Sequence, residues 1–221
     1  MEKLSIGQSI SQSVMILDKA WKEIIALIPR IQEEVENLLD DTKTKFNYKE
    51  GWNTPWDYTE EISEIVSGTI FSLGIYKGSK TTVNRYINFQ ISLFGECIGK
   101  NGEPLLHISL EGDPGDFEFN YMGLDLDDSL ELPICIREDV LLDWEPEGTV
   151  WHDQWWTYSL YLTSINEMED IEAKIIKPLR HFLKNEKAEA IGKLMATPGI
   201  VTYKTCPDDN ARLLVTNNVM P

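Results

Sequence analysis

The residues that could most readily take part in binding or chemistry form an acidic segment between positions 111 and 147. The segment contains thirteen acidic side chains and one basic side chain, Arg137, so it carries a net charge of −12. The whole chain of 221 residues carries −17. A negative field that is concentrated in this way indicates a positively charged partner and argues against a negatively charged one.

Within this segment, the cluster Asp125–Asp128 offers the hard oxygen ligands that calcium and magnesium prefer. A calcium loop spreads its ligands over about twelve residues, with a glycine at the sharp turn and a glutamate at the end. Here Gly123 precedes the aspartates, and residues 130–136 already alternate like a strand. Three interpretations stay open: solvated turn acids, recognition of a basic partner, and a metal site. We assign no metal ligand and expect no cofactor.

A tryptophan-rich run at residues 151–156 is the second unusual feature. On a strand, Trp151 and Trp155 point to one face and Trp156 to the other, so the three rings cannot all enter one core. An exposed tryptophan beside carboxylates suits a cationic protein surface, because its ring supplies contact area and attracts guanidinium groups. The predicted partner-binding residues are Asp113, Asp116, Asp125, Asp127, Asp128, Glu138, Asp139, Trp151 and Trp155.

A search for catalytic chemistry gives no assignment. His107 and Ser109 point the same way on a strand, but no aspartate is placed to orient the histidine as nucleophilic catalysis requires. Asp153 with residues 172–174 resembles the carboxylate and lysine set of some nucleases, yet 172–174 lie in a predicted helix rather than on an adjoining strand. No glycine-rich phosphate loop is present. We therefore name no catalytic residue and favour a protein that is not an enzyme.

Composition restricts the remaining classes. A sequence pI near 4.5 disfavours direct binding of DNA or RNA, which needs clustered lysine and arginine. No run of 18 apolar residues predicts a membrane span, and the N-terminus lacks the apolar core of a signal peptide. The three cysteines form no CxxC pair and are odd in number, which is typical of a reducing compartment. We expect a cytoplasmic protein.

A long amphipathic helix is predicted over residues 8–44. Its apolar side chains recur at steps of three and four residues, which places them along one side of the helix. They are Ile10, Val14, Leu17, Trp21, Ile24, Ile28, Ile31, Val35 and Leu38. Pro29 removes a backbone donor inside this pattern, so we expect a kink or two abutting helices there. A short helix over 58–67 should follow, because Asp57 and Glu60 have the spacing of a capping box.

Residues 69–163 change to the period of two that is typical of strands. Apolar residues such as Ile87 and Phe89 alternate with amides such as Asn88 and Gln90, which predicts an antiparallel sheet whose amide face meets solvent. Asn101-Gly102 is a strong turn dipeptide, and it precedes a further alternating run.

A second helical region is predicted over residues 165–195, with a kink at Pro178, and an irregular tail with short extended pieces over 198–221. The whole chain, 1–221, is predicted to be a single α+β domain. It should contain an antiparallel sheet of five or six strands, with the kinked N-terminal helix and the second-half helix packed on one face.

These observations favour an acidic, non-enzymatic interaction protein that binds a basic protein surface, such as an inhibitor or immunity factor against a nucleic-acid-acting enzyme. Carboxylates would speed association, and aromatic anchors would hold the complex. One alternative is a metal-dependent hydrolase that uses Asp125–Asp128. Another is an accessory subunit of a larger complex. We predict no direct contact with nucleic acid or membrane, and the sequence does not indicate the oligomeric state.

Overall fold

The computed structural model describes residues 5–41, 46–59, 66–78, 82–93, 102–112, 134–144, 155–206 and 209–217. The helices are α1 (Ile6–Asp40), the short 3-10 turn η1 (Leu162–Ser164), α2 (Met168–Ile171), the π-helical turn η2 (Glu172–Ile176), α3 (Lys177–Leu183) and α4 (Lys187–Ala196). The strands are β1 (Phe46–Tyr48), β2 (Asn53–Thr59), β3 (Val66–Lys77), β4 (Arg85–Ser92), β5 (Leu105–Glu111), β6 (Ile134–Arg137), β7 (Leu141–Trp144), β8 (Trp155–Tyr161), β9 (Val201–Cys206) and β10 (Asp209–Asn217).

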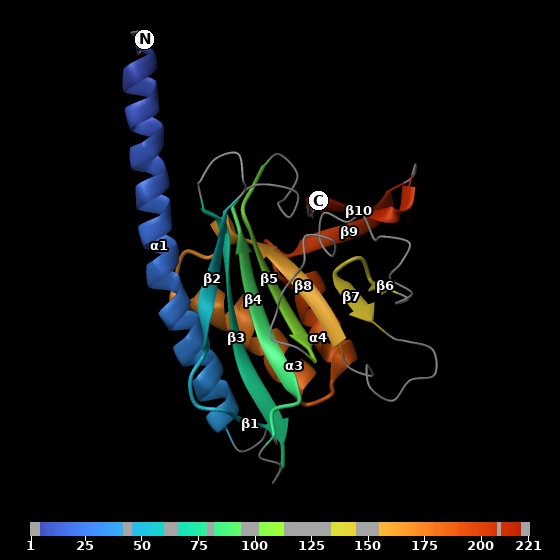
Figure 1. The fold of residues 1–221 in the computed structure, drawn as a ribbon. Coiled ribbons are helices and arrows are strands. Elements are labelled where there is room, and N and C mark those ends of the chain that lie inside the picture. The colour runs from blue at the N-terminus through green and yellow to red at the C-terminus, as the bar shows by residue number, and fades with distance from the viewer. Residues whose placement is uncertain are drawn as a thin grey trace.

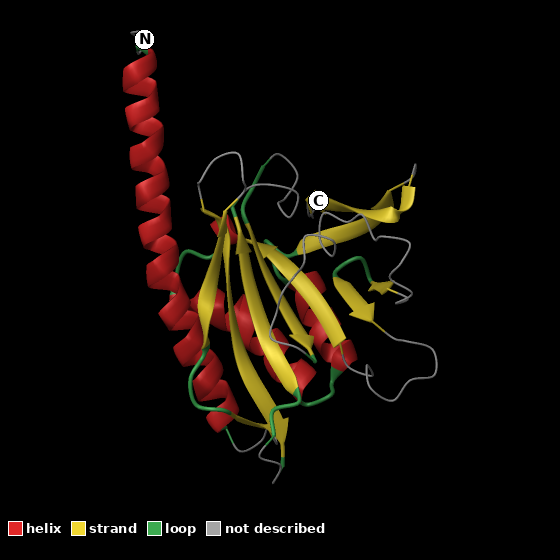
Figure 2. Cartoon of the chain, in the orientation of Figure 1, coloured by secondary structure: helices red, strands yellow, loops and turns green. Residues whose placement is uncertain are grey.

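The centre of the molecule is an antiparallel sheet in the order β1-β3-β4-β5-β8-β7-β6, with β2 also paired to β3 (Figure 1). β1 and β2 pair with different parts of β3, so they share one edge of the sheet. Helices pack against this sheet, and β9 and β10 form a separate hairpin (Figure 2). The predicted α+β class with an antiparallel sheet is confirmed. The sheet has eight strands rather than the expected five or six.

The core lies between one face of the sheet and the helices. The sheet side chains on this face are Phe71, Leu73, Ile75, Ile87, Phe89, Ile91, Leu106, Ile108, Leu110, Trp156, Tyr158 and Leu160. They alternate along their strands with polar residues, as the period of two requires. Trp156 stacks on Phe182 of α3 with ring centroids 4.1 Å apart. Stacked rings add to the free energy gained by burying their apolar area.

α1 begins at a capping box in which Ser5 and Gln8 satisfy each other's backbone N–H groups. The helix runs unbroken through Pro29 to Asp40. Its C-terminal half buries Ile24, Ile28 and Ile31 in the same cluster as the sheet face. Its N-terminal half extends past the sheet (Figure 1).

The second helical region is divided into several pieces. Pro178 stands in the first turn of α3, directly after the π-helical turn η2. Proline cannot donate the regular helical hydrogen bond, so an irregular turn at this place is the expected response to it. The region breaks again between α3 and α4, where Asn185 adopts a left-handed backbone with φ 63°. Glu167 and Asp170 form a capping box at the start of α2.

Two local predictions were wrong. Residues 58–67 were expected to be a short helix, but Tyr58 and Thr59 end strand β2, and β3 begins at Val66; residues 60–65 lie outside the described part of the chain. The match to a capping box was outweighed by pairing with β3, since sheet contacts override a local preference. The amide face of the sheet was expected in solvent, yet Asn88 is 0% and Gln90 2% exposed. Alternation shows which residues share a face, not whether that face is covered.

Two glycines provide a matched stability test. Gly192 lies inside α4 with open space around it, whereas Gly199 has φ +87° and faces the Ser164 side chain. We expect Gly192→Ala to raise the free energy of unfolding by about 0.5–1 kcal/mol, because alanine is the better helix former. Gly199→Ala should lower it by about 1–3 kcal/mol, because a β-carbon strains a left-handed backbone. Urea unfolding measures both; a loss of stability in both variants would contradict the first expectation.

Candidate functional site

Three of the nine predicted partner-binding residues lie in the described part of the chain: Glu138, Asp139 and Trp155. The other six lie outside it, namely Asp113, Asp116, Asp125, Asp127, Asp128 and Trp151. The site proposed from the acidic segment is therefore described only at its later positions.

Glu138 and Asp139 form the exposed turn between β6 and β7, and both have left-handed backbones with φ 47° and 58°. The Asp139 carbonyl accepts a hydrogen bond from the Tyr203 backbone N–H at 2.6 Å. Trp155 is half-buried and its ring covers Gly112, where a β-carbon would lie 2.9 Å from the ring. Trp155 is paired with Trp144 at the opposite end of this hairpin from the turn. The four residues 140–143 separate Asp139 from Trp144, and five steps along an extended chain span up to about 16 Å, so Trp155 and the turn are two separate sites rather than one patch.

Another acid of the same segment has a structural role. The Asp143 carboxylate is 1% exposed and accepts hydrogen bonds from Lys187 Nζ, at 2.7 Å to each oxygen. Arg137 Nε donates to the same carboxylate at 3.3 Å. A buried charge needs such partners, because removing either one leaves an unpaired ion inside the protein. Asp143 thus connects β7 to α4 and is not part of a recognition surface.

A buried polar cluster lies on the face of the sheet opposite the core. His107 Nδ1 lies 2.7 Å from Ser159 Oγ, and the Tyr203 hydroxyl donates to the same oxygen at 2.5 Å. Burial raises the pKa of the Tyr203 hydroxyl far above its usual value. His107, Ser159 and Tyr203 are all fully buried, so a substrate cannot reach the serine in this structure. The cluster stabilises the packing of β9 on the sheet, because a buried polar group that loses its hydrogen bonds is costly.

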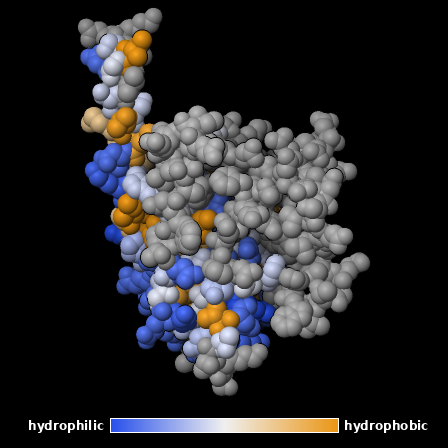
Figure 3. All heavy atoms as spheres, in the orientation of Figure 1, coloured by the Kyte–Doolittle hydropathy of each residue, from blue (hydrophilic) through white to orange (hydrophobic). Residues whose placement is uncertain are grey.

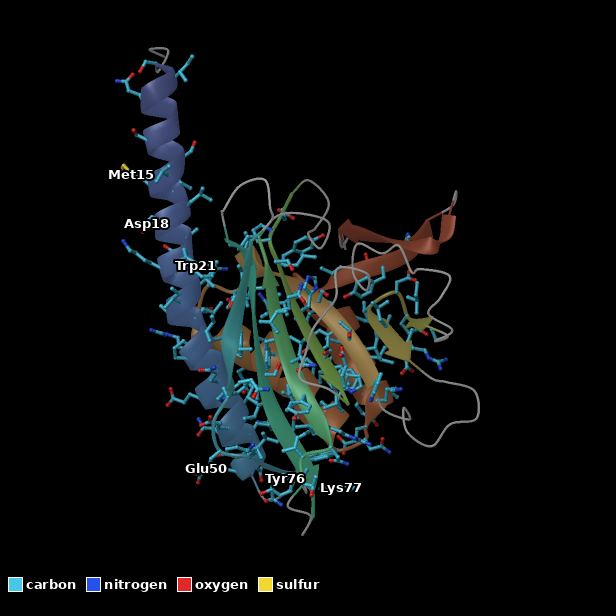
Figure 4. All side chains as sticks on the ribbon, viewed as in Figure 1. Met15, Asp18, Trp21, Glu50, Tyr76 and Lys77 are labelled. Carbon is cyan, nitrogen blue, oxygen red and sulfur yellow. The ribbon has the colours of Figure 1, made fainter. Side chains whose placement is uncertain are left out.

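A pocket of about 660 Å³ lies where the C-terminal end of α1 meets β1 and β3. Its floor includes the buried apolar side chains Leu39 and Phe46, and its rim carries Asp40, Tyr48 and Tyr76. Asn47 and Tyr76 are paired across the two strands, which brings residues far apart in the sequence to one rim. We call this cavity the acidic-aromatic pocket. Figure 4 shows Glu50, Tyr76 and Lys77 at this end of the molecule.

Carboxylates lie near one tyrosine of the acidic-aromatic pocket. The pKa of Tyr48 is raised by burial first and then by the nearby carboxylates of Asp40, Glu36 and Glu50, and its hydroxyl is hydrogen-bonded to Asp40. The last turn of α1 contains no basic residue, so no side chain of that turn neutralises the negative end of the helix dipole. Among the described lining residues, Lys77 is the basic one.

The arrangement suits a long side chain with a cationic tip. An aliphatic stem can lie on the apolar floor while the charged group reaches the carboxylate and the tyrosine rings, which attract cations. A metal ion fits less well: in the ranges that the structure describes, no three His, Cys, Asp or Glu side chains gather in a way that could hold one. The cluster Asp125–Asp128 lies outside those ranges, so the predicted metal alternative stays untested.

Sequence reasoning missed this pocket. The predicted binding surface was in the acidic segment, whereas the pocket lies beside aromatic residues that follow the first helix, such as Tyr48. The available signal was Asp40 and Asp41 at the end of α1, followed after residues 42–45 by Phe46 and Tyr48. Trp52 Nε1 donates to Glu36 at 2.7 Å, so the two groups do meet in the structure.

Comparisons with protein-family models, with curated proteins and with solved structures found no match for this chain. No helix in the described ranges has both the length and the apolar character that crossing a membrane requires.

Two neighbouring hydroxyls on β8 test the structural role of the buried polar cluster. We expect Ser159→Ala to lower the free energy of unfolding by about 1–3 kcal/mol, because it leaves two buried groups without their shared partner. Thr157 Oγ1 is also buried, and it has no hydrogen-bond partner among the described residues. Thr157→Val should therefore be neutral or stabilising. Urea unfolding compares them, and an equal loss in both variants would show that the hydrogen bonds of Ser159 contribute nothing special.

Proposed function

We propose that this chain is an acidic, non-enzymatic interaction protein that binds a basic protein partner. The observation that carries the proposal is the acidic-aromatic pocket, whose rim combines Asp40 with Tyr48 and Tyr76 over an apolar floor. The net charge of −17 supports it, because a negative field accelerates the approach of a cationic protein.

Two kinds of contact would act together in such a complex. Exposed acids such as Glu138 and Asp139 would steer the partner from a distance, and the pocket would hold one lysine or arginine side chain after docking. A basic groove is typical of enzymes that act on nucleic acids. An inhibitor or immunity factor for such an enzyme is therefore the specific role that we favour.

A labelled peptide of nine arginines serves as a defined basic probe, and fluorescence anisotropy at low and high salt measures its binding. We expect Asp40→Asn and Tyr76→Ala each to weaken binding about fivefold, which corresponds to about 1 kcal/mol. The deficit of Asp40→Asn should shrink as salt screens the charge, whereas the deficit of Tyr76→Ala should persist.

Glu189→Gln is the matched control, because it removes one exposed negative charge from α4, outside the pocket. If Glu189→Gln weakens binding as much as Asp40→Asn does, the pocket is not the binding site and only net charge matters. Joint replacement of Asp125, Asp127 and Asp128 by Asn tests the acidic segment in the same assay. A wild-type protein that does not bind the peptide at low salt would remove the support for a basic partner.

A further inference from the structure

The N-terminal half of α1 carries apolar side chains that have no cover in the structure. Ile6 is 82% exposed, Val14 59% and Leu17 48%. Figure 3 shows apolar residues in orange on this half of the helix, which stands clear of the body. Trp21 is the first of the series to pack against the core, and Ile24 is buried in it.

Of these exposed residues, Val14 and Leu17 continue the stripe that forms the core. The positions 14, 17, 21, 24, 28, 31, 35 and 38 are all apolar, and they alternate in steps of three and four. This spacing repeats every seven residues, which is the period of a seam between two supercoiled helices. The C-terminal part of the seam packs on the protein's own sheet, whereas Val14 and Leu17 in its N-terminal part are exposed.

The charged residues of α1 indicate what kind of partner could pack on its N-terminal half. Residues 5–17 contain no Asp, Glu, Lys or Arg. The next four charged side chains pair within the helix, since Lys22 contacts Asp18 at 2.7 Å and Lys19 contacts Glu23 at 3.7 Å. An anionic membrane surface would need basic residues on the polar side of this segment, and none are there. A second copy of the chain presents the same uncharged, apolar stripe and meets no repulsion along it.

We propose that two copies of this protein associate through an antiparallel pair of their α1 N-terminal halves. An antiparallel seam that places Val14 of one copy opposite Leu17 of the other sets the two bodies, each with a charge of −17, at opposite ends. A parallel seam would hold these two bodies side by side, where their charges repel. The contact is isologous, so it closes on itself as a symmetric dimer.

The antiparallel register also fills a groove. With Val14 opposite Leu17, Gly7 of one copy lies beside Ile24 of the other. Ile24 lines a groove of about 760 Å³ between α1 and the segment from η1 to α2, together with Leu27, Ile165 and Met168. The first turn of one α1, with its exposed Ile6, would therefore enter the groove of the other copy.

The area of the interface requires this groove. Val14 and Leu17 of each of two copies bury on the order of 300 Å² along the seam. Stable specific interfaces bury about 1,200–2,000 Å² in total. The seam alone is too small, and the groove supplies further apolar area only when the helices run antiparallel.

Sedimentation velocity of the full chain between about 1 and 300 µM tests the proposal, because an interface of modest size exchanges between monomer and dimer in this range. We expect the wild type to shift from monomer to dimer as concentration rises. Leu17→Asp should remain monomeric at every concentration. Because Leu17 is exposed in the single chain, the circular dichroism spectrum and melting temperature of the Leu17→Asp variant should match those of the wild type. Met168→Asp, in the groove, should weaken the dimer at least tenfold.

Met15→Asp is the matched control, because Met15 is 71% exposed but lies off the seam. Figure 4 shows it on the side of α1 away from the sheet. It should dimerise like the wild type. Loss of the dimer in Met15→Asp would mean nonspecific apolar association and would overturn the proposal. A wild type that stays monomeric at 300 µM would overturn it as well. An unchanged dimer in Met168→Asp would overturn the antiparallel arrangement.

Discussion

Strands β3, β4, β5 and β8 share one apolar face that must be buried away from water. The rest of the structure depends on which segments cover this face. Helices from both ends of the sequence cover this face together, since α1 contributes Ile31 and Val35, and α3 contributes Phe182 against Trp156. Burial of this area supplies most of the favourable free energy of folding. It also determines where α1 crosses the sheet, and therefore where the acidic-aromatic pocket forms and how far the opposite end of the helix extends.

The parts of the fold that could be predicted from the sequence are those with a local period or a local turn. The seam of α1 and the alternation around Ile87 and Phe89 are signals within one segment, and the alternating run expected after Asn101-Gly102 is strand β5, which pairs antiparallel with β4. The disruption expected at Pro178 is present as the π-helical turn before it. Where a local signal competed with pairing, pairing prevailed, as it did at residues 58–59. The alternation of polar and apolar residues also predicted that Asn88 is exposed to solvent. That was wrong, because segments far away in the sequence determine whether a sheet face is covered.

The candidate site and the buried cluster depend on such distant segments. Ser159 meets His107 and Tyr203 only because β5, β8 and the start of β9 are brought together, and no spacing within one segment encodes this. The acidic-aromatic pocket likewise joins the end of α1 to a tyrosine that comes thirty-six residues after Asp40. By contrast, the acidic segment was conspicuous in composition, yet Asp143, one of its described members, forms internal ion pairs. The number of acidic residues in a segment therefore says less about a binding site than the structural environment of each residue does.

The length of α1 has a consequence for how the molecule moves in water. A helix of 35 residues is about 52 Å long. A compact sphere of 221 residues has a radius of gyration of about 17 Å and hence a diameter of about 44 Å, so this rod is longer than such a sphere is wide. Its friction with the solvent exceeds that of a sphere of equal mass, and its tumbling is faster about the helix axis than across it. Amide groups in α1, whose N–H bonds lie along that axis, therefore report slower rotation than amides in the sheet that point in other directions.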